Sequence, residues 1–219
     1  MTELPPEESF VDTALAESTE VREFFGSSYD QVARFASRLA AEGELRGLIG
    51  PRELPRLWER HIVNSAAVVP FIDDGASIAD VGSGAGLPGL VIAMMRPASS
   101  VVLIEPMERR CEWLSEMAAE LQLSNVEIRR GRAEEFHDAF EVQFVTARAV
   151  AALDKLCRMC LPLVARGGQM VVLKGQNVDR EVPGALKVTR KLRAEAPEVL
   201  DAQTVAGVET TKVVRIRRP

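Results

Sequence analysis

The stretch IADVGSGAGLPG, residues 78–89, places four glycines within eight positions directly after a short apolar run. Glycine adopts backbone conformations that are closed to other residues, and it lets a neighbouring group approach the main chain closely. The glycine-rich turn that binds nicotinamide dinucleotides has the spacing G-x-G-x-x-G, which from Gly82 requires a glycine at position 87. This chain has Leu87 there, and its third glycine is Gly86. The turn therefore predicts a bound ligand or a closely packed helix and argues against a dehydrogenase.

Short β-rich segments alternate with helical segments over residues 75–219. The expected strands are SIADV, SVVLIE, NVEIRR, VQFVTA, GQMVVLKG and TTKVVRIR. The expected helices cover about residues 87–95, 108–123, 153–165 and 179–191. This alternation predicts a mostly parallel α/β sheet with helices on both faces. In such a sheet a ligand binds beyond the carboxyl ends of the strands, and the glycine turn is the first strand-to-helix connection.

The pattern of residues 1–74 predicts a small helical extension. Apolar residues recur at three and four positions in ALAESTEVREFFG and YDQVARFASRLAAEG, and each segment ends at a glycine, Gly26 or Gly43. A third amphipathic helix is predicted for LPRLWERHIVNSAAVVPFI, where Pro70 stops it. We therefore expect two parts, the extension over 1–74 and a ligand-binding domain over 75–219.

The composition predicts a compact protein without a membrane span. The chain has 219 residues, 47% of them hydrophobic, and no apolar run approaches the roughly 18 residues of a spanning helix. The N-terminus MTELPPEESF lacks the residue order of a secretory signal. Three cysteines are too few for a disulfide framework, so we expect free thiols and a cytoplasmic location. The CRMC stretch at 157–160 predicts buried helix positions and no metal, because only two histidines accompany the cysteines.

Charge is distributed unevenly along the chain. The net charge is -5, and the first fifty residues hold ten acidic and four basic residues, so the remaining 169 carry a net charge of +1. Three clusters without acids, RRGR, KVTRKLR and KVVRIRRP, fit either a solvated surface or contacts with nucleic-acid phosphates. The candidate phosphate contacts within them are Lys187, Lys191, Lys212, Arg215 and Arg217.

An acidic residue stands two positions before the first glycine of the turn. Asp80 followed by G-x-G-x-G resembles the motif of class I S-adenosylmethionine-dependent methyltransferases. This resemblance implies a Rossmann-like, mostly parallel seven-stranded sheet with S-adenosylmethionine as the cofactor. Glu105 ends the second expected strand about 20 residues past the glycines, where a carboxylate can accept hydrogen bonds from ribose hydroxyls. Without a ligand, the turn would only let a helix pack closely and Glu105 would only cap the next helix.

Five motifs narrow the resemblance, and in chain order they are RLWERHIVNS, DVGSGAGLPG, RAEEF, TARAVAAL and LKGQ. From Leu57 to Gln176 the chain resembles the bacterial glucose-inhibited division protein B family, whose members are 16S ribosomal RNA guanine-N7 methyltransferases. The resemblance implies 16S RNA or the small ribosomal subunit as the partner, and we expect a monomer that binds no membrane. One position departs from the family pattern, because Asn64 stands where the family usually has aspartate.

The resemblance, together with the charge and position of single residues, predicts roles for individual side chains. Arg148, after the fourth expected strand, and Lys174, at the end of the fifth, are the catalytic candidates, and both are expected to position the reactants. Arg60, His61 and Lys174 are the candidate RNA contacts, although His61 fits packing against the core equally well. The candidate cofactor contacts are Asp80, Gly82, Gly84, Leu87, Glu105, Ala133, Glu134 and Arg148.

The residues after the fourth expected strand, TARAV, lack groups that other base methylations use. Methylation at pyrimidine C5 needs a cysteine nucleophile, and methylation of an exocyclic amine often uses an Asn/Asp-Pro-Pro-aromatic turn. Guanine N7 has a free lone pair and can attack a sulfonium methyl group without first losing a proton, so positioning alone can supply the catalysis. These absences agree with the guanine-N7 methylation that the resemblance implies, and the basic clusters and the few aromatic residues favour RNA as the substrate. The alternatives are a small-molecule methyltransferase and a noncatalytic ribosome-assembly factor.

Overall fold

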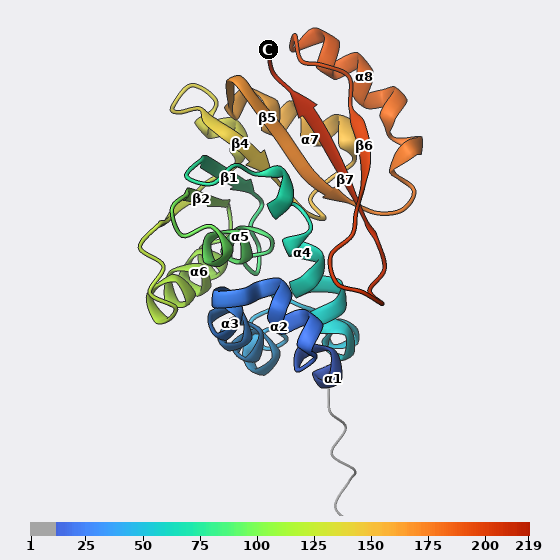
Figure 1. The fold of residues 1–219 in the computed structure, drawn as a ribbon. Coiled ribbons are helices and arrows are strands. Elements are labelled where there is room, and N and C mark those ends of the chain that lie inside the picture. Colours follow the sequence, from blue (N-terminus) through green and yellow to red (C-terminus); the bar gives the residue numbers. More distant parts are fainter. Residues whose placement is uncertain (1–11) are drawn as a thin grey trace, which may run out of the picture.

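The computed structural model describes residues 12–219, which form a seven-stranded sheet in the order β3-β2-β1-β4-β5-β7-β6 (Figure 1). The strands are β1 (Ser77–Val81), β2 (Ser100–Glu105), β3 (Val126–Arg130), β4 (Val142–Thr146), β5 (Val164–Lys174), β6 (Glu198–Ala202) and β7 (Thr211–Arg217). Strands β1 to β5 are parallel, whereas β7 is antiparallel to its neighbours β5 and β6. The mostly parallel sheet is confirmed, and β6 is the one strand that the residue pattern did not predict.

Strand β1 lies in the middle of the sheet and determines where a ligand site can form. Its residues after Ser77 are all buried, because helices cover both faces of the strand. The order of the strands reverses beside it, since β2 lies on one side of β1 and β4 on the other. At such a reversal the connections leave toward opposite faces and open a crevice beyond the carboxyl ends of the strands.

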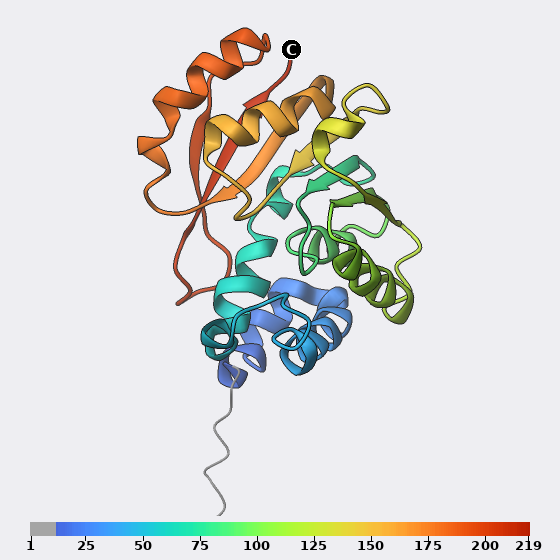
Figure 2. The same cartoon turned by 180° about the vertical axis from the view of Figure 1, so that it is seen from behind.

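Helices cover both faces of the sheet, as Figures 1 and 2 show. They are α5 (Gly89–Met95) and α6 (Glu108–Glu120) on one face, and α7 (Leu153–Cys160) and α8 (Val182–Lys191) on the other. Successive strand residues point to opposite faces, so Ile78 belongs to the first core and Ala79 to the second. Cys157 and Cys160 are fully buried in the second core, which confirms that the CRMC stretch occupies buried helix positions. All three cysteines are free thiols, as predicted.

The N-terminal extension is helical, but its helices are more interrupted than predicted. Its elements are α1 (Thr13–Ala16), α2 (Thr19–Phe25), α3 (Tyr29–Glu42), a 3-10 segment (Pro51–Arg56), a π-helical segment (Trp58–Val63), α4 (Asn64–Ala66) and a 3-10 turn (Val69–Phe71). The predicted first helix is divided at Ser18, whose hydroxyl accepts a hydrogen bond from the Val21 N–H and begins a new helix. The helix predicted before Pro70 is shorter and less regular than expected, because residues up to Arg56 form a 3-10 segment and helical backbone then continues through the wider π-helical turns to Ala66. No helix within residues 12–219 is long and apolar enough to cross a membrane.

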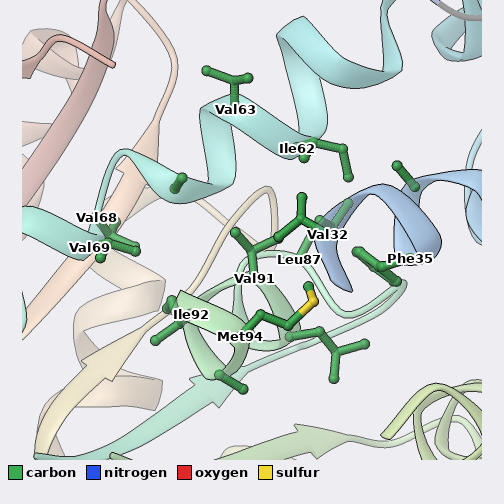
Figure 3. Packing of buried hydrophobic residues seen from close by; sticks show 14 of the residues in the cluster. Val32, Phe35, Ile62, Val63, Val68, Val69, Leu87, Val91, Ile92 and Met94 are labelled. Atoms are coloured by element: carbon green, nitrogen blue, oxygen red, sulfur yellow. The ribbon is translucent and has the colours of Figure 1, made fainter. Parts of the chain in front are cut away.

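The extension shares a hydrophobic core with the face of the sheet that carries α5 (Figure 3). Val32 of α3 and Ile62 of the π-helical segment pack with Leu87 of the glycine turn and Val91 of α5. All four side chains are buried, and burying each stabilises the fold by about 1.5–3 kcal/mol. The glycine turn is therefore supported by the sheet on one side and by the extension on the other.

The carboxylate of Asp12 holds the start of the π-helical segment. One oxygen accepts a hydrogen bond of 2.8 Å from the Trp58 N–H, and the other accepts one of 2.8 Å from the Glu59 N–H. The first N–H groups of a helix have no partner within the helix, and a negative charge there is favourable. These contacts fix the direction of the backbone that leads into Arg60 and His61.

Replacement of Gly89 by alanine is expected to destabilise the protein. A Cβ atom there would lie 2.3 Å from Leu103 Cδ2 and 2.6 Å from Asp80 Oδ2, so α5 would have to move away from the sheet. Overpacking of this kind costs about 1–3 kcal/mol in the free energy of unfolding, which urea denaturation measures. The matched control is Gly50→Ala, because no atom lies within 4 Å of the added Cβ, and its effect should stay within about 0.5 kcal/mol. Equal stability of the two variants would contradict this account of the packing.

Candidate functional site

A cavity of about 720 Å³ lies at the carboxyl ends of β1, β2 and β4. Its walls come from the glycine turn, the segments after β2, β3 and β4, and the extension, which contributes His61. Seven of the eight predicted cofactor contacts line it, namely Gly82, Gly84, Leu87, Glu105, Ala133, Glu134 and Arg148. The structure thus brings together residues that are up to 66 positions apart in the sequence.

The glycines of the turn serve two different purposes. Gly82, Gly84 and Gly86 all have positive φ angles, of 71°, 56° and 98°, which L side chains rarely adopt. A Cβ atom at Gly82 would lie 2.8 Å from Val150 Cγ2 on the opposite wall of the cavity. At Gly86 it would lie 2.4 Å from Leu90 Cδ1 of α5. Gly82 therefore keeps the cavity open, and Gly86 lets the helix pack onto the turn.

Glu105 lies at the end of β2 with its carboxylate at the cavity. Its side chain is 2% exposed, and its two oxygens accept hydrogen bonds from the N–H of Gly84 at 2.9 Å and of Met107 at 3.0 Å. Arg110 Nη1 lies 3.9 Å from the same carboxylate. Met107 is the N-cap of α6, so Glu105 joins the glycine turn to the start of that helix while its remaining lone pairs stay at the cavity wall.

Asp80 is the predicted cofactor contact that does not line the cavity. Its side chain is fully buried beneath the turn, where Oδ2 accepts a hydrogen bond of 3.0 Å from the Gly89 N–H. Burial raises the pKa of this carboxyl to about 7, opposed by hydrogen bonds and by the charge of Arg148. The structure therefore places Asp80 as the group that fixes the start of α5 against β1, because the cavity is separated from it by the turn itself.

Arg148 follows β4 and is held by the extension. Its Nη1 donates to the Arg60 carbonyl at 3.2 Å and its Nη2 to His61 Nδ1 at 3.0 Å, while the buried Nε has no partner. Burial lowers the pKa of the guanidinium to about 10, which leaves it charged at neutral pH. The next residue, Ala149, has a positive φ of 56°, a conformation that is uncommon outside glycine and occurs at functional sites.

The hydrogen bonds of His61 indicate a neutral imidazole ring. A guanidinium only donates, so His61 Nδ1 accepts from Arg148 and the ring proton sits on Nε2, which donates to Glu53 Oε2 at 3.0 Å. Burial and the nearby Arg148 lower the pKa of His61, against the opposing effect of Glu53. The residue pattern did not single out Glu53, because no local signal marks a carboxylate eight residues before a histidine as its partner.

A second cavity of about 270 Å³ adjoins the first and contains the remaining RNA candidates, Arg60 and Lys174. Lys174, a candidate for positioning the reactants, does not line the first cavity with Arg148. Its Nζ forms an ion pair of 2.8 Å with Glu181 and donates to the Ala151 carbonyl at 3.0 Å, so its charge supports the segment after β4. Glu53 and His61 line both cavities and form the wall between them.

The predicted basic clusters differ in how much of their charge is free. On β7 every candidate is paired, Lys212 with Asp201 at 2.7 Å, Arg215 with Glu198 at 2.7 Å and Arg217 with Glu195 at 3.5 Å. On α8, Lys187 and Lys191 are exposed, and within the described part of the chain neither has a carboxylate at ion-pair distance. The α8 lysines are therefore better suited to bind phosphate than the β7 cations.

Solved structures of similar shape define the class of the fold. An S-adenosylmethionine-dependent O-methyltransferase from Thermotoga maritima has a TM-score of 0.55 and 18% sequence identity, covering 71% of this chain and 65% of that chain. TYW2 of M. jannaschii in complex with AdoMet has a TM-score of 0.56 and 16% identity, covering 72% and 76%. Together with the strand order, these structures define a class I methyltransferase fold, as the sequence predicted.

Sequence relatives place the chain within that class. The family model for rRNA small subunit methyltransferase G matches residues 28–206. A ribosomal RNA small subunit methyltransferase G from Beutenbergia cavernae is 50% identical over 90% of this chain and 92% of its own length, and one from Clavibacter michiganensis is 49% identical over 88% and 91%. The chain belongs to the rRNA small subunit methyltransferase G family, which is the glucose-inhibited division protein B family that the motifs resemble.

Gly82→Val is expected to abolish binding of S-adenosylmethionine. The new side chain would enter the cavity at a backbone conformation that suits only glycine, and its Cβ would collide with Val150. Isothermal titration calorimetry should show binding of S-adenosylmethionine to the wild type and none to the variant. NAD is the matched control ligand and should bind neither protein, because Leu87 stands where its fingerprint needs glycine. Comparable binding of NAD to the wild type would contradict the assignment of the cavity.

Proposed function

We propose that this chain transfers the methyl group of S-adenosylmethionine to N7 of a guanine in 16S ribosomal RNA. The observation that carries the proposal is the family membership, which rests on 50% identity over nine-tenths of the chain. The cavity at the carboxyl ends of the parallel strands supports it, because this is where the fold class binds its cofactor. The target guanine lies in RNA of the small ribosomal subunit, either free or assembled.

The residues around the cavity fit S-adenosylmethionine. The bare backbone at Gly82 and Gly84 leaves space that a Cβ atom would fill, and Leu87 covers the turn. Glu105 is suited to accept hydrogen bonds from ribose hydroxyls, and Ala133 and Glu134 from the segment after β3 are suited to hold the adenine. When bound there, the cofactor supplies an electrophilic methyl group on a sulfonium.

The chemistry of the site suits a nucleophile that needs no deprotonation. His61 cannot act as a base in the arrangement described, because one ring nitrogen carries a proton and the lone pair of the other accepts from Arg148. Burial raises the pKa of Cys157 to about 12 and raises that of Cys160 as well, so neither thiol is a nucleophile at neutral pH. Arg148 is suited to hold the guanine edge or a phosphate, and catalysis then rests on placing N7 in line with the methyl group.

The two parts of the chain divide this work. Residues 75–219 bind the cofactor, and residues 1–74 present Arg60 and His61 to the RNA from the other side of the cavity. Lys174 acts through its contacts with Glu181 and Ala151, which fix the segment that carries Arg148. The enzyme works as a monomer in the cytoplasm, where its substrate is made.

The reaction product is expected to be 7-methylguanosine. Methylation at N7 places a positive charge on the ring and makes the nucleotide labile to borohydride followed by aniline. RNA treated in this way should break at one guanosine only after incubation with both enzyme and S-adenosylmethionine. Arg148→Ala should lower turnover about 100-fold through lost positioning. A methylated product that resists cleavage would contradict the N7 assignment.

The pH dependence of the same reaction tests the absence of a general base. Because N7 is unprotonated at neutral pH, turnover should change little between about pH 6.5 and 9, provided that binding of RNA and cofactor is constant. His61 should not introduce a step in this range, since burial and Arg148 move its pKa downward. A bell-shaped profile would show that a protein group accepts a proton during the reaction.

RNA affinity should depend on salt through α8 more than through β7. Each phosphate contact that is lost should flatten the plot of log affinity against log salt by roughly 0.7 to 0.9. We expect Lys187→Ala with Lys191→Ala to flatten it by about two such contacts, because both charges are free. The matched control replaces Lys212, Arg215 and Arg217 by alanine and should change the slope less, since carboxylates already neutralise these cations. Filter binding to 16S RNA at several salt concentrations measures the slope for each variant. An unchanged slope in the α8 variant would show that Lys187 and Lys191 are solvated surface charges that do not contact RNA.

A further inference from the structure

We propose that Glu53 is a positioning residue, which fixes the His61 ring so that it holds the Arg148 guanidinium at the wall between the two cavities. The inference concerns the same site and rests on the proposed function. Three side chains from two parts of the chain form a continuous series, Glu53 to His61 at 3.0 Å and His61 to Arg148 at 3.0 Å. The quoted motifs do not include Glu53, which lies three residues before Arg56, where RLWERHIVNS begins.

The series has one consistent direction of hydrogen bonding. Arg148 has five N–H groups and no acceptor, so it determines that His61 Nδ1 carries the lone pair. The proton of the neutral ring is then on Nε2, and it needs an acceptor, which Glu53 Oε2 supplies. Without that acceptor the ring would keep one hydrogen bond and could turn about its side-chain bonds. The carboxylate therefore fixes the orientation of the imidazole and, together with Arg148, its tautomer.

Arg148 depends on this support because its charge is buried without a direct carboxylate. Within residues 12–219 no carboxylate lies at ion-pair distance from it, and its two side-chain contacts are the Arg60 carbonyl and the His61 ring. A buried cation is costly unless it is hydrogen-bonded and its charge is compensated. Asp80, beneath the turn, and Glu53, one imidazole away, both attract the guanidinium, and of the two Glu53 acts from the extension.

The position of Glu53 suits this role. It lies in the 3-10 segment between Pro51 and Pro55, two residues whose rings restrict the backbone around it. Its side chain is 38% exposed and lines both cavities. The hydrogen bond from His61 lowers the pKa of Glu53, which keeps the carboxylate charged. The charged groups that face His61 are Glu53, Arg60 and Arg148. Glu53 raises the pKa of the ring, and the two arginines lower it.

Two substitutions at position 53 separate positioning from a direct contact with RNA. Glu53→Gln keeps an acceptor for His61 Nε2–H and removes the charge, whereas Glu53→Ala removes both. We expect Glu53→Ala to lower kcat about tenfold with little change in the Kd for S-adenosylmethionine, and Glu53→Gln to recover most of the loss. Glu20→Gln, an exposed carboxylate on α2, is the control for removing a charge from the extension. Thermal denaturation of each variant reports whether it is folded.

A measurement on the ring itself does not depend on turnover. The chain has two histidines, so ¹⁵N-labelled histidine gives two sets of signals, and His137→Gln assigns those of His61. In the wild type and in Glu53→Gln, the Nδ1 signal should be that of an unprotonated nitrogen and the Nε2 signal that of a protonated one. In Glu53→Ala the two should shift toward each other, as the ring exchanges between tautomers. The pKa of His61 should fall in Glu53→Ala and rise in Arg148→Ala, because each variant removes the opposite influence.

The outcomes distinguish positioning of His61 by Glu53 from other roles of the carboxylate. Wild-type turnover and unchanged histidine signals in Glu53→Ala would overturn the proposal. Glu53→Gln as impaired as Glu53→Ala, with the His61 signals of the wild type, would also overturn it and would show that the carboxylate acts through its charge and not by orienting the ring. If the wild-type protein methylates no RNA, the proposed function fails, while the histidine signals still decide whether Glu53 fixes the ring.

Discussion

The turn after β1 has no room for a side chain at Gly82 or at Gly89, and the other features of the site depend on this constraint. At Gly89 it lets α5 approach β1 and β2 closely enough for the buried Asp80 to accept a hydrogen bond from the helix start. The extension packs on α5 and on the turn, so its position follows from that close approach. His61 of the extension then contacts Arg148, which follows β4. The two walls of the cavity are thus placed by one short segment of backbone.

Much of this arrangement could be predicted because the signals are local. The spacing of the glycines, the apolar runs and the order of the motifs lie within short stretches, and each predicts its element without knowledge of its neighbours. Strand β6 was missed because it lies at the sheet edge, where its burial is partial and its residues EVLDA show no alternating pattern. The contacts of Asp80, Lys174 and Glu53 could not be predicted for another reason: each depends on a partner that only the tertiary structure supplies.

The charged residues of β7 also have partners that the sequence alone does not reveal, and these partners lie on the neighbouring strand β6. In the sequence alone, KVVRIRRP is a cluster of basic residues without an acidic one. In the sheet, β7 runs antiparallel to β6, and the register places Lys212 opposite Asp201 and Arg215 opposite Glu198. Opposite charges facing each other across strands stabilise the pairing, so the basic residues of one strand and the acidic residues of the other form one neutral edge. A count of charge along the chain therefore overstates the positive surface that RNA can meet.

Asn64 joins the extension to β7, since its Nδ2 donates a hydrogen bond of 2.8 Å to Thr211 Oγ1 beside the second cavity. The family usually has aspartate at this position, and a carboxylate can only accept, so the threonine hydroxyl would then have to donate its proton to it. With asparagine the polarity of the contact is reversed. The hydroxyl receives a hydrogen bond and keeps its own proton for another acceptor, and the cavity carries one negative charge less. In this chain the amide of Asn64 therefore gives the wall of the second cavity a neutral hydrogen-bond donor in the place where an aspartate would add a negative charge.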